Sequence, residues 1–333
     1  MNTDANARVS QRPLMSIIVP CFNEEAVIGR FFETVTAELD ALDADWEIIC
    51  VDDGSRDNTL ERLLEFARTD ERVKVLELTR NFGKEAAITA GLDVSTGDVV
   101  VPLDADLQDP PSLIAAMLAQ WRNGYDVVYA SRRSRQRDTL TKRVTAGGFY
   151  KLYNRLTTVP IPENTGDFRL MDRRVVDRLG ELPERTRFMK GLFAWLGFKS
   201  TAVEYDRPAR EEGQTSWSYW KLWNFALDGL TSFSTVPLRV WTYVGMAVSL
   251  LSFLYAAFLI FRTLFLGVDT PGYASIMVVV LFLGGVQLIS LGVIGEYLGR
   301  VFVEVKQRPV YLVDRVYQFG KQDDHDTAEA GPE

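Results

Sequence analysis

The chain has few of the residues on which common enzyme chemistries depend. It contains one histidine, His325, which lies in a polar C-terminal stretch. A catalytic triad built on histidine and a histidine general base are therefore excluded. The two cysteines, Cys21 and Cys50, lie in apolar runs without a CxxC spacing. A structural zinc site is not supported, and buried free thiols are expected.

Familiar nucleotide-binding loops are also missing. No GxGxxG follows the first apolar run, and no GxxxxGK[ST] occurs anywhere in the chain. A dinucleotide dehydrogenase and a P-loop NTPase are therefore disfavoured. The net charge of -8 argues against a general nucleic-acid binder. Residues 1–13 are polar and contain no apolar h-region, so they predict a flexible arm rather than a signal peptide.

Long uncharged runs are confined to the last third of the chain. None occurs before Pro237, whereas Val240–Phe261 and Thr270–Gly295 carry no charge. A helix needs about 20 apolar residues to cross a bilayer, and both runs are long enough. We therefore predict two transmembrane helices, about 240–262 and 270–296, within a segment spanning 237–300.

Basic residues predict the orientation of this hairpin. The turn between the two runs carries Arg262 alone, and the outer flanks carry the others: Lys221, Arg239, Arg300, Lys306, Arg308 and Arg315. Because lysine and arginine favour the cytoplasmic side, both flanks and the preceding domain are expected to face the cytoplasm. The segment 301–333 is expected to be cytoplasmic and to end in a disordered tail.

The first part of the chain alternates between two patterns. Short apolar, β-branched runs occur at Met15–Pro20, Glu47–Val51, Val73–Leu78, Val99–Leu103 and Asp126–Ala130. Helix-like stretches separate them at Glu25–Leu39, Asn58–Ala67, Lys84–Asp93 and Pro111–Trp121. This alternation predicts an α/β domain over residues 14–215 with a doubly wound, mostly parallel sheet. Thr165–Met171 is expected to be a loop that enters another strand.

Acidic residues follow three of these predicted strands. Glu24 comes after the first, Asp52 and Asp53 end the second, and Asp104, Asp106 and Gln108 follow the fourth. Strand ends of a parallel sheet meet at one edge, where ligands bind. Crowded oxygen ligands favour a hard cation, so the sequence predicts Mg²⁺ or Mn²⁺. Lys84 opens a helix, where it either meets an anion or is solvated.

An aromatic segment precedes the first apolar run. Trp217–Phe233 is rich in tryptophan and has few charges. Tryptophan prefers the membrane–water interface, so residues 216–236 are expected to form an amphipathic helix on the membrane. An ordinary core helix is the alternative.

Several motifs together resemble a known family. PCFNEE, VDDGS, DADLQDPP, ASRRS, TGDFRLM and REEGQTSWSYWKLWNFALDGLTSFST occur in this order. As a set, followed by the hairpin, they resemble the polyisoprenyl-phosphate glycosyltransferases. These are family 2 inverting enzymes similar to dolichol-phosphate mannose synthase, in the bacterial branch with two spans. The resemblance covers about Met15 to Arg315 and implies a glycosyltransferase A-type fold.

The resemblance implies roles for individual residues. The nucleotide-binding set is Pro20, Glu24, Asp52, Asp53, Lys84 and Asp104. The metal set is Asp104, Asp106 and Gln108, and the catalytic set is Asp106, Asp167 and Arg169. The acceptor-phosphate set is Arg132, Arg207, Arg210 and Ser216. Ser216 stands where the related pattern has a lysine, which puts one phosphate contact in doubt. Asp167 is a base, a positioning carboxylate or a turn residue.

These features together predict an enzyme of the bacterial inner membrane. It is expected to transfer a sugar from a nucleotide-sugar to undecaprenyl phosphate, with UDP-glucose as the expected donor. GDP-mannose, UDP-N-acetylglucosamine and a UDP-aminoarabinose derivative are alternatives. A processive polysaccharide synthase is disfavoured because no QxxRW follows Asp167. A non-enzymatic membrane partner is disfavoured by the intact acidic clusters. Glycine faces on the second span are compatible with a homo-oligomer.

Overall fold

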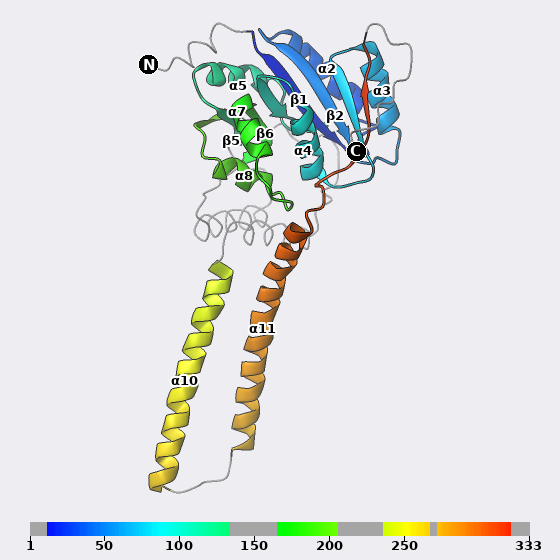
Figure 1. Ribbon diagram of the computed structural model, residues 1–333. Coiled ribbons are helices and arrows are strands. Elements are labelled where there is room, and N and C mark those ends of the chain that lie inside the picture. The colour runs from blue at the N-terminus through cyan, green and yellow to red at the C-terminus, as the bar shows by residue number, and fades with distance from the viewer. Residues whose placement is uncertain (1–11, 134–164, 206–235, 267–271, 321–333) are drawn as a thin grey trace.

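The computed structural model describes residues 12–133, 165–205, 236–266 and 272–320. An α/β domain lies at one end of the molecule, and two long helices project from it (Figure 1). Within the described residues, eight strands form one sheet in the order β7-β5-β6-β4-β1-β2-β3-β8. The strands are β1 (Leu14–Cys21), β2 (Asp45–Asp52), β3 (Val73–Leu78), β4 (Val99–Pro102), β5 (Val127–Arg132), β6 (Thr165–Asp172), β7 (Ser200–Tyr205) and β8 (Val313–Gln318).

The centre of the sheet is parallel and buried on both faces. β1 pairs in parallel with β2 and β4, and β2 with β3. Ile17, Ile18 and Val19 are consecutive in β1 and fully buried. A strand covered by helices on both faces needs apolar residues at every position rather than at alternate ones. The predicted doubly wound, mostly parallel sheet is therefore confirmed.

Antiparallel strands complete the sheet on both sides. β6 lies between β4 and β5 and is antiparallel to both. Its strand begins at Thr165, so the expectation of a loop entering a strand was wrong at this motif. β8 pairs antiparallel with β3 at the other edge. The chain thus returns to the sheet after its two long helices, which the sequence analysis did not predict.

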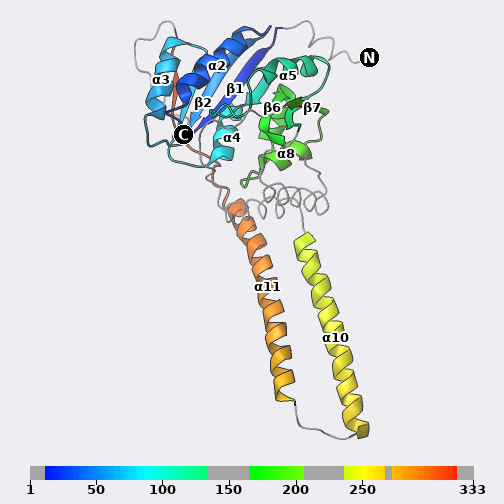
Figure 2. The ribbon, with the colours of Figure 1, turned by 180° about the vertical axis from the view of Figure 1, so that it is seen from behind.

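Helices cover both faces of the sheet (Figures 1 and 2). They are α2 (Ile28–Asp40), α3 (Thr59–Thr69), α4 (Lys84–Val94), α5 (Leu113–Arg122), α7 (Arg173–Gly180) and α8 (Met189–Trp195). α4 is buried continuously from Ala86 to Leu92. A Cβ on Gly91 would lie 2.3 Å from Cγ2 of Ile18, so glycine permits α4 to approach β1 closely. This contact fixes the N-terminus of α4 near the strand ends.

The two projecting helices are α10 (Val236–Leu266) and α11 (Tyr273–Lys306). Figure 2 shows from behind that they run next to each other, away from the sheet. Their apolar side chains are exposed, with Leu264 at 76% and Leu288 at 71%. In the described residues, Phe282–Lys306 is long and apolar enough to cross a membrane, and Tyr243–Tyr255 is a shorter apolar stretch. The segment Trp217–Phe233 lies outside the described residues.

Candidate active site

Acidic side chains gather at the carboxyl ends of β1, β2 and β4. Asp52 ends β2, while Glu24 and Asp104 follow β1 and β4 closely. Because these strands are parallel neighbours, their ends share one edge of the sheet. Glu24 lies close enough to Asp104 and Asp106 for their charges to raise its pKa. The structure thus brings together residues from separate predicted motifs.

Asp53 fixes the loop that leads into α4. Its carboxylate accepts hydrogen bonds from the backbone N–H groups of Phe82, at 2.7 Å, and Gly83, at 2.8 Å. The intervening Gly54 has a φ of 67°, and a Cβ there would lie 2.7 Å from backbone atoms of Arg80 and Asn81. Only glycine permits this approach. The first N–H groups before α4 are therefore occupied by Asp53.

Asp52 is buried differently from its neighbour. It is 2% exposed, and its Oδ2 accepts a hydrogen bond from the Ser55 backbone at 3.1 Å. Its Oδ1 is buried without a hydrogen-bond partner in the described structure. Burial raises the pKa of Asp52 despite the bonds from Ser55. A buried acceptor without a partner is costly, which makes Asp52 a candidate for ligand binding.

Lys84 joins two of the predicted carboxylates. Its Nζ lies 2.7 Å from an oxygen of Asp104 and 2.9 Å from one of Asp167. Burial disfavours the charged amine, but Asp167 and Asp104 outweigh this effect and raise the pKa of Lys84. The predicted contact of Lys84 with an anion stays a prediction, and its side chain keeps part of its surface exposed to solvent. Its observed partners are carboxylates.

Asp167 is held in its ionised form. Burial disfavours its charge, but Lys84, Lys190 and Arg169 lower its pKa to about 2. A carboxylate with so low a pKa is a poor proton acceptor near neutral pH. Of the three roles left open for Asp167, the geometry favours a positioning and charge-balancing carboxylate.

A second group of carboxylates has excess negative charge. Burial and the charges of Asp106, Asp104 and Asp57 raise the pKa of Glu24 to about 7. Asp106 accepts hydrogen bonds from the backbone and the amide of Gln108. In the described ranges no three His, Cys, Asp or Glu side chains are arranged to enclose a metal ion. The donors are nevertheless oxygen atoms with uncompensated charge, which fit a hard divalent cation.

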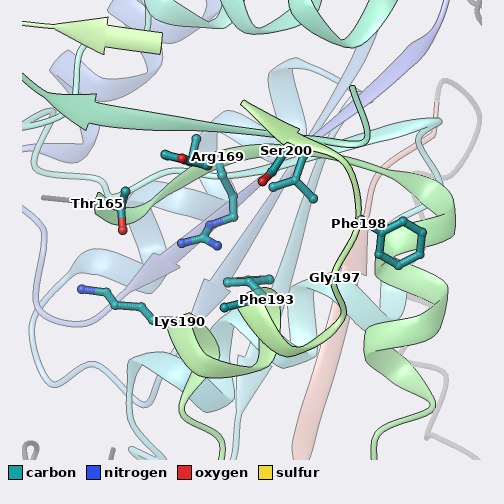
Figure 3. Close-up of a pocket in the computed structure, with 10 residues that line it drawn as sticks. Thr165, Arg169, Lys190, Phe193, Gly197, Phe198 and Ser200 are labelled. Carbon is teal, nitrogen blue, oxygen red and sulfur yellow. The ribbon is translucent and has the colours of Figure 1, made fainter. Parts of the chain in front are cut away.

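Arg169 and Lys190, whose charges act on Asp167, line a cavity of about 160 Å³, which we call the cationic cavity. Arg169, in β6, is 5% exposed, and its guanidinium lies 3.9 Å from the centre of the Phe193 ring. It donates hydrogen bonds to the carbonyl oxygens of Gly166, at 2.8 Å, and Asp167, at 3.3 Å. Figure 3 shows Arg169, Lys190 and Thr165 around the same space. Burial lowers the pKa of Arg169 to about 10, so it stays charged near neutral pH.

For the other predicted site residues the structure gives a backbone position or nothing. Pro20 lies in β1 opposite Val51. Arg132 is the last residue of β5 and pairs with Tyr205 of β7. The remaining predicted acceptor-phosphate residues, Arg207, Arg210 and Ser216, lie outside the described residues. Their roles stay predictions.

The sequence analysis missed two charged residues at this site. Glu85 has a buried Oε2 without a hydrogen-bond partner among the described residues, and burial and Asp167 raise its pKa to about 8. Lys190, in α8, lines the cationic cavity. For both residues, the sequence contains a feature that could have marked them as site candidates. Glu85 directly follows Lys84, and Lys190 is the one charge within the aromatic segment Phe188–Phe198.

Comparisons with known proteins identify the family of the chain. Residues 16–180 match the family Glycosyl transferase family 2, and residues 236–301 match the GtrB C-terminal hairpin. A bactoprenol glucosyl transferase of Shigella flexneri, derived from prophage SfII, is 49% identical over 304 residues, 91% of this chain and 98% of the relative. An uncharacterized glycosyltransferase of Synechocystis sp. is 58% identical over 303 residues, 91% of this chain and 95% of the relative.

Among solved structures, the chain is similar to glucosyl-3-phosphoglycerate synthase of Mycobacterium tuberculosis in complex with Mn²⁺, UDP-glucose and phosphoglyceric acid. The identity is 19%, the coverage is 68% of this chain and 80% of that chain, and the TM-score is 0.45.

The fold, its acid-rich strand ends and the family match define a family 2 glycosyltransferase. With relatives of 47–58% identity over almost the whole chain, the protein belongs to the polyprenyl-phosphate glycosyltransferases that include the bactoprenol glucosyl transferases. The predicted family and enzyme class are therefore confirmed.

Proposed function

We propose that the protein transfers glucose from UDP-glucose to undecaprenyl phosphate. The observation that carries this proposal is a series of charged contacts from the cationic cavity to the strand ends: Arg169 and Lys190 act on Asp167, and Lys84 pairs with both Asp167 and Asp104. Donor and acceptor are both anionic, so both need positive charge: basic side chains can supply it to the acceptor phosphate, and a cation held by the strand-end acids can supply it to the donor diphosphate. The names of the Shigella relatives supply the sugar and the lipid.

The acceptor needs little activation. A phosphate monoester has a second pKa of about 6, so it is largely ionised at neutral pH. Arg169 and Lys190 would bind and orient this phosphate, which offsets its repulsion from the donor diphosphate. No strong base is required, which agrees with the low pKa of Asp167. Attack from the face opposite the leaving group inverts the anomeric centre.

A divalent cation, Mg²⁺ or Mn²⁺, fits the oxygen donors of the strand ends. Asp104, Asp106 and Gln108 would hold it, and Glu24 lies within electrostatic reach. When bound, such an ion stabilises negative charge on a departing diphosphate. Asp52 and Asp53 would bind the nucleoside, with Asp53 also holding the loop before α4.

We place the enzyme in the bacterial inner membrane with its catalytic domain facing the cytoplasm. The exposed apolar surfaces of α10 and α11 support two spans, as does the basic bias of their flanks. The domain bounds proposed from the sequence are kept, except that residues 301–306 continue α11 and 313–318 return to the sheet. A homo-oligomer stays a prediction.

Purified full-length protein with a panel of donors tests the function. We expect UDP-glucose, with undecaprenyl phosphate and Mg²⁺ or Mn²⁺, to give a glucose-labelled lipid that is extracted into organic solvent. If the lipid is labelled from GDP-mannose, UDP-N-acetylglucosamine or UDP-aminoarabinose instead, the proposed donor is wrong but the proposed transfer to undecaprenyl phosphate still holds. Formation of a polymer would favour a processive synthase, and no label from any donor would refute the proposal.

A further inference from the structure

The catalytic domain forms hydrogen bonds with the end of α11 through the carboxylate of Glu304. Glu304, in the last turn of α11, accepts hydrogen bonds from the backbone N–H groups of Arg185 and Thr186. Arg185 N lies 3.0 Å from each carboxylate oxygen, and Thr186 N lies 3.1 Å from Oε1. Hydrogen bonds to an ionised acceptor are about twice as strong as neutral ones. We call this contact the Glu304 clamp.

The clamped backbone leads directly into the wall of the cationic cavity. α8 begins at Met189, a short distance after Thr186, and supplies Lys190 and Phe193 to that cavity. The Phe193 ring packs against the Arg169 guanidinium at 3.9 Å (Figure 3). A displacement of the clamped backbone would therefore move the groups that line the proposed acceptor subsite.

A different connection ties α11 to the nucleotide side of the sheet. After Gln307, whose φ is 49°, the chain passes Tyr311 and joins the sheet as β8. The Tyr311 hydroxyl donates to Asp93 of α4 at 2.8 Å, and the Leu312 carbonyl accepts from Thr79 N at 3.0 Å. The β8 connection therefore contacts α4 and the edge strand β3, whereas the Glu304 clamp contacts the backbone that precedes α8. Substitution of Glu304 removes the clamp bonds and leaves the hydrogen bonds of the β8 connection in place.

We propose that Glu304 is a positioning residue for the lipid acceptor. It sets the distance of α8, and so of Lys190 and the Phe193 ring that packs on Arg169, from the apolar surface of α11. A phosphate anchored in a bilayer by its polyprenyl chain has a restricted height, so the subsite must be held at a matching height. This inference rests on the proposed function for the identity of the acceptor substrate. The existence of the Glu304 clamp rests on the observed hydrogen bonds alone.

Steady-state kinetics on full-length protein in lipid bilayers tests the proposal. Glu304→Ala removes all the clamp bonds and is expected to raise the apparent KM for undecaprenyl phosphate about ten-fold. The KM for UDP-glucose and the response to a short, water-soluble polyprenyl phosphate should change little. Glu304→Gln keeps one carbonyl oxygen at the Oε1 position, which accepts both N–H groups, so its effect should be smaller.

Glu296→Gln is the matched control. Glu296 lies two turns earlier in α11 and forms a helical ion pair with Arg300 at 3.1 Å. Its removal should leave every kinetic constant unchanged. An unchanged KM for undecaprenyl phosphate in folded Glu304→Ala would overturn the proposal. So would equal losses with long and short acceptors, because these would show no dependence on membrane anchoring.

Hydrogen exchange separates this inference from the proposed function. In Glu304→Ala, backbone N–H groups between Arg185 and Phe193 should exchange faster than in the wild type, while those of β3 and β8 stay protected. Unchanged exchange would refute the clamp whatever the substrate. If wild-type protein transfers nothing to undecaprenyl phosphate, the proposed function fails and exchange alone decides whether the clamp holds α8.

Discussion

At the residue scale, the site depends on a balance between closely spaced acids and a few buried cations. Lys84 pairs with both Asp104 and Asp167, so its single charge does not balance the two, whereas Asp106 and Glu24 have no such partner of opposite charge in the described contacts. This difference assigns the two groups of carboxylates separate roles. Asp167 orders the cationic side, and the Glu24–Asp106 side suits a bound cation.

Asp106→Asn should reduce glucose transfer by about a hundred-fold or more, because loss of one electrostatic stabiliser commonly has this effect. Thermal stability should be unchanged, since among the described residues Gln108 is the one side chain that forms a hydrogen bond with the Asp106 carboxylate. Asp43→Asn, at an exposed ion pair with Arg122, is the control. Full activity of Asp106→Asn in the presence of EDTA would remove both the metal and its ligand from the mechanism.

Glu47 should make stability depend on acid pH. Burial disfavours its charge, but hydrogen bonds from Lys74, Ser16 and Thr96 outweigh burial and lower its pKa. Ionised Glu47 therefore stabilises the fold above its unfolded pKa of about 4.3, and this contribution is lost as pH falls through the lower folded value.

Glu47→Gln should lower the unfolding midpoint at pH 7, where the change costs about 1–3 kcal/mol. The gap between wild type and variant should narrow as the pH falls below about 4. Thermal unfolding in detergent at several pH values measures both effects. Because Glu47 lies at the opposite end of β2 from Asp52, UDP-glucose binding to folded variant should be normal. A gap that is constant with pH would contradict the assigned pKa direction.

At the element scale, the close packing of α4 against β1 determines where Lys84 and Glu85 lie. Gly91→Ala places a Cβ 2.3 Å from Cγ2 of Ile18, so the helix or the strand must shift. We expect a loss of about 1–3 kcal/mol in stability, together with reduced transfer. Gly180→Ala, at the end of α7, has no atom within 4 Å of the new Cβ and should be neutral. Equal unfolding midpoints for both variants would contradict this account of the packing.

The predictability of elements follows from how local their signals are. Apolar runs such as Ile17–Val19 predict buried strands because burial on both faces requires them. β8 is a largely exposed edge strand that carries both polar and apolar residues. Its partner, β3, lies far away in sequence. No local pattern reveals such pairing. Similarly, the partners of Lys84 depend on how closely α4 approaches β6, which sequence spacing does not determine.

At the site, too, residues with local sequence signals were predictable and residues placed by long-range contacts were not. The acids at strand ends were predictable because turns after parallel strands converge on one edge. The contribution of Lys190 was not, because tertiary packing places α8 at the cavity: Phe193 lies on Arg169, and Met189 and Leu192 pack in the core. Glu304 is still more remote, since its clamp joins the last turn of the hairpin to a residue 119 positions earlier in the chain. Long-range contacts of this kind require the folded structure.

At the scale of the whole molecule, the orientation that we propose has the domain and the tip of the hairpin on opposite sides of a bilayer. Both native cysteines are buried, so they give little background in thiol labelling. Leu264→Cys lies beyond the predicted end of the first span, near the hairpin tip, whereas Gly320→Cys lies beyond β8 on the domain side. In intact cells a membrane-impermeant thiol reagent should label the first variant alone, and lysis should be needed to label the second. Labelling of Gly320→Cys in intact cells would place the catalytic domain outside, away from cytoplasmic UDP-glucose, and would exclude the proposed orientation.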